Sequence, residues 1–515
     1  MNVSCALAFI ISALLLIVYY ISKWKYNYWE KKKVPYVKPQ PFVGNYGAYI
    51  FMKKYSGTVI QELCEQFPKE PYFGTFFGTE PALVVKDPEL LKLIFTKDFY
   101  YFSGREVSKY THKEVVTQNL FFSYGDRWKV MRQNLTPLFS SAKMKNMFYL
   151  IGNCTQALED MIDYEISFSE AVEMKSLMSR YTMDCITSCA FGVESNTMGK
   201  DQDNNPFKRM SVEIFNPSTI SGIKTVMRLM WPAIFYALKL QWFPTIITDF
   251  FMRVMKDVFQ KRDYKPSERN DFVDSVLSFK KDSYIEGDRL SKDRIGGSKK
   301  LQLRVDDDLL VSLCVQFFGA GFDTTSTAMT FTLYELSKNQ DVQERAKVEV
   351  EEYFRKHDGK IDYSCVSELP YLDACLQETT RLYPILGILA REVMDDYTFP
   401  TGLQVEKGMR IHVPVNYIHR NPDYFPDSLK YKPERFLPGA EDIIKPYTFL
   451  SFGEGPRTCI GLRFAKMQGI AGLAAMLGKY RFELADGMPQ KIEFNAKVYN
   501  AQSISDIRLK IIKRE

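Results

Sequence analysis

The chain has 515 residues, 46% hydrophobic and 14% aromatic, which is enough to bury a large core. Its net charge of +6 arises from 68 basic and 62 acidic residues without a long basic run, which argues against a nucleic-acid-binding surface. Nine cysteines without disulfide-like spacing and only four histidines argue against a disulfide scaffold and a zinc site, and indicate a reducing compartment.

An almost unbroken apolar run extends from Val3 to Ile21 and is long enough to cross a bilayer as one helix. Five lysines follow between positions 23 and 33, and such a positive flank stays on the cytoplasmic side. A cleaved signal peptide is the alternative, but no Lys or Arg precedes the run and its basic flank is typical of a stop-transfer sequence. The sequence therefore predicts a retained membrane anchor over residues 1–22, with the rest of the chain on the cytosolic side.

Residues 23–45 combine the basic flank with three prolines, which cannot continue a helix, so the chain stiffens and turns there. The segment from Phe73 to Lys86 predicts a hairpin-like pair of strands around a Gly-Thr-Glu-Pro turn. Most later segments have helical patterns, and Glu286 to Lys300, with clustered lysines, predicts a solvated loop. No repeat or linker-bounded unit appears, although length alone would suggest about three domains.

Residues 306–338 carry helical apolar periodicity, and about 33 residues at ~1.5 Å each would cross the whole body of the protein. Gly319 and Gly321 lie in the middle of this helix, each costing on the order of 1 kcal/mol against alanine. Asp323 and Thr324 then interrupt the apolar run. Tight helix packing, with hydroxyls bonded to the preceding turn, is one explanation for so costly a sequence, and a functional groove is the other.

Two pairs of residues share helix faces. Trp128 and Arg132 are four apart, and a surface cation–π pair is the simplest interpretation. Glu378 and Arg381 are three apart on a helix that ends before Pro384, which alone would indicate a surface ion pair. Neither pair identifies a function without further context.

The segment FGEGPRTCIG, residues 452–461, presents Cys459 in a loop rich in glycine. Glycine lets a backbone approach a flat ligand closely, and a thiolate is a soft, strongly donating metal ligand. Arg457 could neutralise an anionic group beside that ligand. A buried free cysteine is the alternative interpretation.

The spacing of five residues in this loop resembles the haem-binding signature of the cytochrome P450 family, in which the cysteine is the axial ligand of the iron. These residues are Phe452, Gly455, Arg457, Cys459 and Gly461. AGFDTT, from Ala320, resembles the oxygen-binding motif of that family, and PERF, from Pro433, its companion motif to ETTR. The resemblance covers nearly the whole chain, is closest to insect detoxification-type microsomal members, and implies a mainly α fold with a smaller β-rich part. It also implies one haem domain over residues 46–515.

The resemblance implies roles for the residues around the haem. Thr324 would hold water or the activated oxygen group, and Asp323 would help to relay protons from solvent. The cofactor-binding residues would be Cys459 as the iron ligand, Trp128, Arg132 and Arg391 at the propionates, and Arg457, Phe452, Gly461 and Ala320 nearby. Glu378, Arg381 and Arg435 would form a buried cluster that supports the haem pocket.

The resemblance also indicates where substrate would bind. In relatives the region that corresponds to the aromatic stretch from Phe207 to Phe259 roofs the substrate pocket. The expected substrate contacts are Tyr110, Phe121, Phe215, Phe317, Ile385, Leu386, Leu389 and Asn500. Together they predict a pocket for bulky lipophilic compounds.

The implied activity is that of a monooxygenase with haem b, which inserts one atom of O2 into lipophilic xenobiotics or endogenous lipids and hormones. Electrons would come from NADPH through a separate cytochrome P450 reductase, with cytochrome b5 as a candidate second donor, at the endoplasmic reticulum membrane. A basic face could steer such an acidic donor; it comprises Arg127, Lys129, Lys143, Lys145, Arg463 and Lys466. The rival hypotheses are a haem-thiolate isomerase or dehydratase and a haem-binding sensor or carrier without turnover.

Overall fold

The computed structural model describes residues 12–13, 16, 19–105, 108–199, 204–215, 218–280, 283–290, 300–440 and 443–514. Most of the predicted anchor lies outside these residues, so the anchor stays a prediction. Within the described part, the helix that is long and apolar enough to span a membrane is Asp307–Lys338, and 72% of its apolar window is buried inside the protein. That burial is the property of a core helix.

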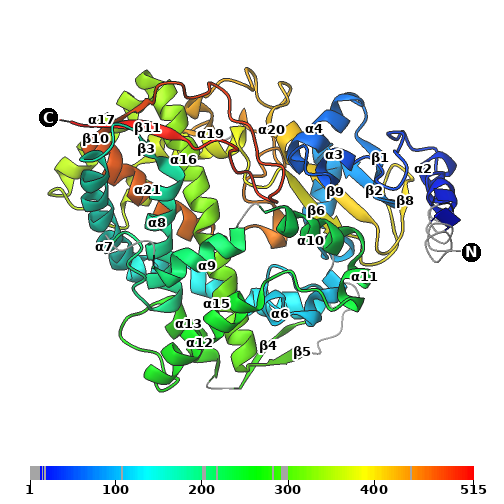
Figure 1. Ribbon diagram of the computed structural model, residues 1–515, viewed down its shortest axis with the longest axis horizontal. Coiled ribbons are helices and arrows are strands. Elements are labelled where there is room, and N and C mark those ends of the chain that lie inside the picture. The colour runs from blue at the N-terminus through cyan, green and yellow to red at the C-terminus, as the bar shows by residue number, and fades with distance from the viewer. Residues whose placement is uncertain are drawn as a thin grey trace, which may run out of the picture.

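The β-rich part is built on a four-stranded sheet in the order β1 (Tyr72–Phe77), β2 (Glu80–Val85), β9 (Arg410–Pro414) and β6 (Ile388–Glu392). The β1–β2 hairpin is antiparallel, as predicted, and β9 runs parallel to β2. Trp29 of α2 (Tyr28–Lys31) lies against this sheet and donates to the carbonyl of Thr75 at 2.9 Å. A Cβ at Gly74 would lie 2.4 Å from Trp29 Cγ, so this glycine makes room for the indole. The start of the chain is thereby attached to the sheet, at the right of Figure 1.

The helical part surrounds two consecutive central helices, α15 (Asp307–Gly321) and α16 (Asp323–Lys338), as predicted for residues 306–338. The Asp306 side chain caps the first of them by accepting from the Leu309 N–H at 2.9 Å. α16 packs against α8 (Met174–Ile186), α19 (Pro370–Leu382) and α21 (Leu462–Lys479), and α21 packs on α7 (Ser141–Ile166). This bundle occupies the left of Figure 1, opposite the sheet. The expected mainly α architecture with a smaller β-rich part is confirmed.

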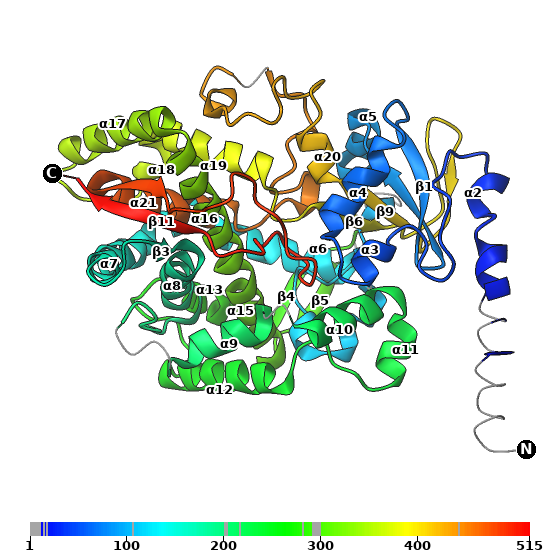
Figure 2. The same ribbon diagram turned by 45° about the horizontal axis from the view of Figure 1, so that its top comes forward.

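Four helices form an outer layer of the molecule: α9 (Pro206–Phe215), α10 (Thr219–Met230), α11 (Pro232–Ala237) and α12 (Thr245–Lys261). They lie along the lower side of Figure 2, below α15. Beside them, β4 (Tyr284–Asp288) and β5 (Lys300–Arg304) form an antiparallel pair, and β4 packs on α6 (Gly125–Leu135). The prediction of a solvated loop over 286–300 is therefore wrong at both ends, because backbone pairing joins the residues that flank 291–299.

The other described elements complete the body. They are α3 (Gly47–Ile50), α4 (Ser56–Glu65), α5 (Pro88–Lys92), α13 (Phe272–Lys280), α17 (Gln340–Lys356), α18 (Cys365–Glu368), α20 (Val415–His419), β3 (Val172–Glu173), β7 (Tyr397–Thr398), β8 (Gln404–Val405), β10 (Tyr480–Leu484) and β11 (Arg508–Lys513). β10, β11 and β3 form a second, antiparallel sheet at the far end of the bundle.

Candidate active site

The central helix is interrupted close to Gly319 and Gly321. α15 ends at Gly321, α16 begins at Asp323, and the Phe322 N–H lies 3.4 Å from the Phe318 carbonyl. A Cβ at Gly321 would lie 2.7 Å from Ile186 Cδ1, so glycine permits close packing on α8, whereas nothing lies within 4 Å of a Cβ at Gly319. The Thr324 hydroxyl donates to the Ala320 carbonyl at 2.6 Å. The structure therefore shows the tight packing and the hydroxyl bonded to the preceding turn, while the functional groove stays a prediction.

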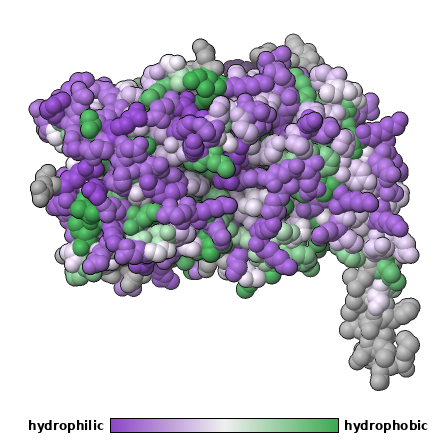
Figure 3. Space-filling model, turned by 90° about the horizontal axis from the view of Figure 1, so that it is seen from above, coloured by the Kyte–Doolittle hydropathy of each residue, from purple (hydrophilic) through white to green (hydrophobic). Residues whose placement is uncertain are grey.

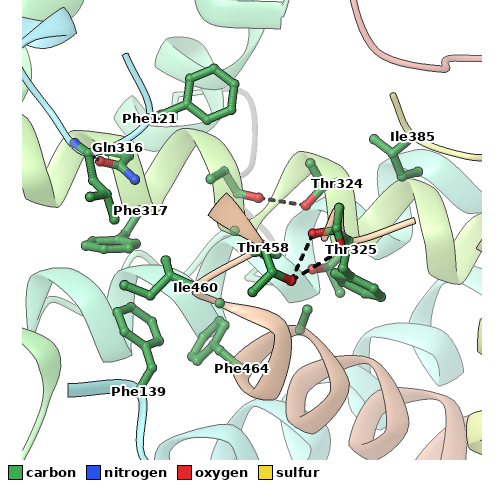
Figure 4. A pocket seen from close by; sticks show the side chains of 18 of the residues that line it. Phe121, Phe139, Gln316, Phe317, Thr324, Thr325, Ile385, Thr458, Ile460 and Phe464 are labelled. Carbon is green, nitrogen blue, oxygen red and sulfur yellow. Dashed lines mark hydrogen bonds between the residues drawn. The ribbon is translucent and has the colours of Figure 1, made fainter. Parts of the chain in front are cut away.

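A cavity of about 270 Å³ lies at this interruption, between the Cys459 loop and α15. Figure 4 shows it walled by phenylalanines on one side and by Thr324 and Thr325 on the other. Fourteen predicted residues line it: Trp128, Arg132, Arg391, Arg457, Phe452, Gly461, Ala320, Thr324, Cys459, Phe121, Phe317, Ile385, Leu386 and Leu389. Segments more than 300 residues apart along the chain are thus brought to one space.

The cavity has one strongly positive end. Arg105, Arg132, Arg391 and Arg457 all line it, and no aspartate or glutamate is among the described lining residues. Burial and the charge of Arg105 lower the pKa of Arg391 to about 9, and burial lowers the pKa of Arg105 to about 10. Arg391 Nε is buried without a hydrogen-bond partner. This end of the cavity therefore fits a ligand that carries negative charge.

The protein holds these cations by backbone and aromatic contacts. Arg457 donates through Nε to the Ser103 carbonyl at 2.8 Å and through Nη2 to the Ser123 carbonyl at 2.6 Å, and its guanidinium lies 4.6 Å from the Trp128 ring. Burial, then the other three arginines, lowers the pKa of Arg457 well below its usual range. Trp128 thus supports Arg457 in addition to lining the cavity. Arg105 was missed in the sequence, because no motif marks it.

The loop around Cys459 requires its glycines. Gly455 has φ +69°, and a Cβ there would lie 1.9 Å from the Phe95 carbonyl oxygen. The Cys459 N–H donates to the Phe452 carbonyl at 2.8 Å, which closes the loop. Among the described cysteines, Cys459 is exposed, to the cavity, while the other seven are buried. The alternative of a buried structural cysteine therefore fits those seven and not Cys459.

The Cys459 thiol experiences opposing influences. Its place deep in the molecule raises its pKa, while a backbone hydrogen bond from Gly461 and the charges of Arg132 and Arg105 oppose that rise. A cation at the cavity, such as a metal ion, would add to the second group and favour the thiolate.

The predicted cluster of Glu378, Arg381 and Arg435 is present behind the loop. Arg381 donates to both Glu378 oxygens at 2.7 Å, and both side chains are fully buried. Arg435 Nε lies 3.4 Å from Glu378 Oε1. Arg381 also donates to the carbonyls of His419 and Ser428 at 2.7 Å, so its charge is satisfied on every side.

His419 connects this cluster to the Cys459 loop. Its Nε2 accepts from the Leu450 N–H at 2.8 Å, which leaves Nδ1 as the donor to the Arg381 carbonyl at 3.1 Å. Burial and the charge of Arg381 lower its pKa to about 3. A neutral imidazole therefore joins α19 to the entry of the loop.

Besides the three residues of the Glu378 cluster, four predicted site residues lie outside the cavity lining. Asp323 is 2% exposed, and Lys175 Nζ contacts its Oδ1 at 2.8 Å, while the Asn500 amide donates to its Oδ2. The Tyr110 ring stacks on Tyr236 with centroids 5.4 Å apart, and Phe215 contacts Phe322 with centroids 5.1 Å apart. The structure gives Tyr110, Phe215 and Asn500 other partners, so their assignment as substrate contacts stays a prediction.

The aromatic stretch from Phe207 to Phe259, which was expected to roof the pocket, also lies outside the cavity lining. No residue described between 206 and 261 lines the cavity. Its inner wall comes instead from residues of other segments, among them Leu120, Phe139, Phe272 and Gln316. Hydrophobic periodicity describes one helix or strand at a time, so it could not predict that these four residues, which come from separate segments, share one wall.

Comparison with known proteins agrees with this arrangement. Residues 34–506 match the family model of Cytochrome P450. The chain is 32% identical to Cytochrome P450 6B2 of Helicoverpa armigera over 98% of both chains, and 32% identical to Cytochrome P450 6k1 of Blattella germanica over 99% of this chain and 97% of that relative. It is 33% identical to Probable cytochrome P450 6w1 of Drosophila melanogaster over 97% of this chain and 96% of that relative. The chain therefore belongs to the cytochrome P450 family, whose members bind haem b through a cysteine thiolate and use O2 with electrons from a redox partner as monooxygenases.

Proposed function

We propose that the cavity holds haem b with Cys459 as the axial ligand, and that the protein oxidises lipophilic small molecules there. The observation that carries this proposal is an exposed thiol and four arginines on one cavity, with no acid among the described residues that line it. The two propionates of haem supply the missing negative charge. When bound, haem activates O2, and a thiolate ligand favours O–O cleavage. The residues of the chain then bind, orient and supply protons.

Proton supply is the task that we assign to Thr324 and Asp323. Because the Thr324 hydroxyl gives its hydrogen to the Ala320 carbonyl, its oxygen is left to accept a hydrogen bond from water in the cavity. Asp323 lies next in the chain, and its partner Lys175 has a side chain that is 30% exposed. Lys175 Nζ also contacts the hydroxyls of Ser326 and Thr327 at 2.6 and 2.7 Å. We infer that this polar group links solvent to the oxygen of Thr324.

Substrates are taken to be lipophilic because the wall opposite the threonines is aromatic and aliphatic. Phe121, Phe139 and Phe317 are seen in Figure 4, and Ile385 lies across from them. Burying such surface is worth about 25 cal/mol per Å², which favours compounds with little polar surface. Xenobiotics and endogenous lipids or hormones share this property.

Attachment to the endoplasmic reticulum membrane, with the body on the cytosolic side, follows from the predicted anchor over residues 1–22. A second feature supports it: the outer layer exposes apolar side chains, namely Ile220, Ile223, Trp231, Ile234, Leu238 and Ile246. In Figure 2 the described helical residues 19–25 extend down on the same side as α10 and α11. The face seen in Figure 3 is, by contrast, largely hydrophilic.

NADPH-cytochrome P450 reductase is the proposed electron donor, with cytochrome b5 as a second partner. Of the predicted basic face, Lys143, Lys145 and Arg463 are exposed. Lys466 instead pairs with Asp373 at 2.7 Å, and Arg127 is half-buried. Three exposed cations leave a smaller docking face than the sequence predicts, and its attraction for an acidic partner falls with added salt.

The test is the carbon monoxide difference spectrum of the reduced full-length protein. Wild-type protein should give the strongly red-shifted band of thiolate ligation, and Cys459→Ser should lose it. Cys64→Ser, which changes a buried cysteine in α4, should keep it. An unchanged band in Cys459→Ser overturns the proposal. NADPH-dependent product formation with added reductase then excludes an isomerase and a carrier, neither of which consumes NADPH.

A further inference from the structure

The cavity wall near Phe121 and Phe317 contains one carboxamide. Gln316 is the sole Asn or Gln among the described residues that line the cavity. Its neighbours on that wall are apolar, including Leu120 and Phe272. A polar group in such a wall is stable only when its hydrogen bonds are made. The hydrogen-bond partners of the Gln316 carboxamide therefore indicate what this wall of the cavity can bind.

The orientation of this carboxamide is fixed by the backbone. The Leu120 N–H lies 2.9 Å from Gln316 Oε1, and an N–H can pair only with the oxygen of the amide. The nitrogen, Nε2, is therefore not the atom that meets Leu120. Gln316 lies beside Phe317 in Figure 4. Among the residues that the structure describes, its two N–H groups have no hydrogen-bond partner. They remain available to a molecule in the cavity.

Leaving the Nε2 donor without a partner costs free energy, and this cost depends on the ligand that occupies the cavity. A ligand with an oxygen acceptor completes the bond to Nε2, whereas a pure hydrocarbon that displaces water from Nε2 leaves a buried donor unpaired. Sites with a built-in donor discriminate by this asymmetry. Gln316 precedes Thr324 by eight residues, which is on the order of 12 Å along a helix. The donor thus lies well away from the place of oxygen chemistry.

We propose that Gln316 determines substrate specificity by donating from Nε2 to an acceptor oxygen, such as a ketone, ether or ester oxygen, on an otherwise lipophilic substrate. The acceptor is held toward one end of the cavity, and oxidation takes place on carbons some two helical turns away, beside Thr324. This inference rests on the proposed function of the same cavity. It names the class of substrate as oxygen-containing lipophilic compounds rather than hydrocarbons.

The test uses two probes that differ by one group: octanophenone, which has a ketone, and octylbenzene, which has a methylene at that position. Equilibrium dialysis of each probe with the haem-loaded full-length protein gives the two dissociation constants. Wild-type protein should bind octanophenone about fivefold more tightly, the worth of one neutral hydrogen bond. In Gln316→Leu the ratio should fall to about one. A ratio that stays near fivefold in Gln316→Leu overturns the proposal.

Controls separate recognition from packing. Phe317→Leu alters the same wall without touching the carboxamide, so it should shift both probes alike and keep the ratio. Gln316→Met is a second variant of similar length, for use if Gln316→Leu does not fold, and the same ratio of about one is expected of it. The carbon monoxide spectrum of each protein reports whether Cys459 still holds haem. A lost spectrum in wild type would count against the proposed function, whereas an intact spectrum with unchanged ratios counts against Gln316 alone.

Discussion

Two regions of the protein face each other across α15 and are stabilised differently. The floor, made of the Cys459 loop, α19 and the 3-10 helix Pro433–Phe436, is held by buried ions whose hydrogen bonds are complete. The outer layer, α9 to α12, is held largely by aromatic contacts and by Glu114, which accepts from Tyr236 at 2.9 Å and from the Trp242 N–H at 3.1 Å. Arg262 at the end of α12 also pairs with Asp271 at 2.7 Å. The floor therefore has few alternative arrangements, whereas the outer layer can shift at little cost.

The largest expected effect is in the floor. Glu378→Gln removes the charge that neutralises Arg381 and Arg435 but keeps the volume of the side chain. Because breaking a buried pair leaves an uncompensated charge, we expect the free energy of unfolding to fall by about 3–5 kcal/mol, with loss of bound haem. Urea unfolding and the ratio of haem to protein measure both. Glu434→Gln removes the exposed partner of Arg345 and should change stability by less than about 1 kcal/mol. If Glu378→Gln and Glu434→Gln lowered the free energy of unfolding equally, the buried cluster would not be the source of the stability of the floor.

The next effect concerns chemistry between the two regions. Thr324→Val keeps the shape of the side chain but removes the oxygen that we assign to proton supply. Product formed per NADPH consumed, with added reductase, should fall on the order of a hundredfold, the usual size of a general-acid contribution. Thr325→Val is the matched control, because Thr325 is adjacent and also lines the cavity. Full coupling in Thr324→Val would remove Thr324 from the mechanism.

A third prediction concerns the pH dependence of the floor. The pKa of His419 is about 3 in the folded protein and ~6.5 when unfolded, so between these values the unfolded chain binds a proton that the folded protein does not. The contribution of His419 is complete above pH ~6.5 and is lost as pH falls, at about 1.4 kcal/mol per pH unit. Unfolding free energies measured from pH 6 to 4 should show this slope, and His419→Gln should flatten it. His112→Gln, which changes an exposed histidine, is the control.

The same contrast explains what could be predicted from the sequence. Cys459 and Arg457 were found because their loop is local: its glycines and its ligand lie within ten residues. Asn500 was predicted to contact substrate, yet it bonds Asp323, a residue 177 positions away, and no local pattern records such a pairing. Arg105 and Gln316 were missed for a related reason. The role of a single arginine or glutamine depends on the cavity that it lines, and the sequence does not show that cavity.

The smallest expected effect is in the outer layer. Tyr236→Phe removes the hydroxyl that joins Arg228, at 2.8 Å, to Glu114, but keeps the ring that stacks on Tyr110. One hydrogen bond is worth about 1 kcal/mol, so stability should fall by roughly that amount. Because no residue described in this layer lines the cavity, the dissociation constant of octanophenone should stay within about twofold of wild type while its association and release both quicken. Stopped-flow mixing measures these rates. If affinity falls as far as it does in Gln316→Leu, the outer layer shapes the site directly, and its separation from the floor is smaller than the structure indicates.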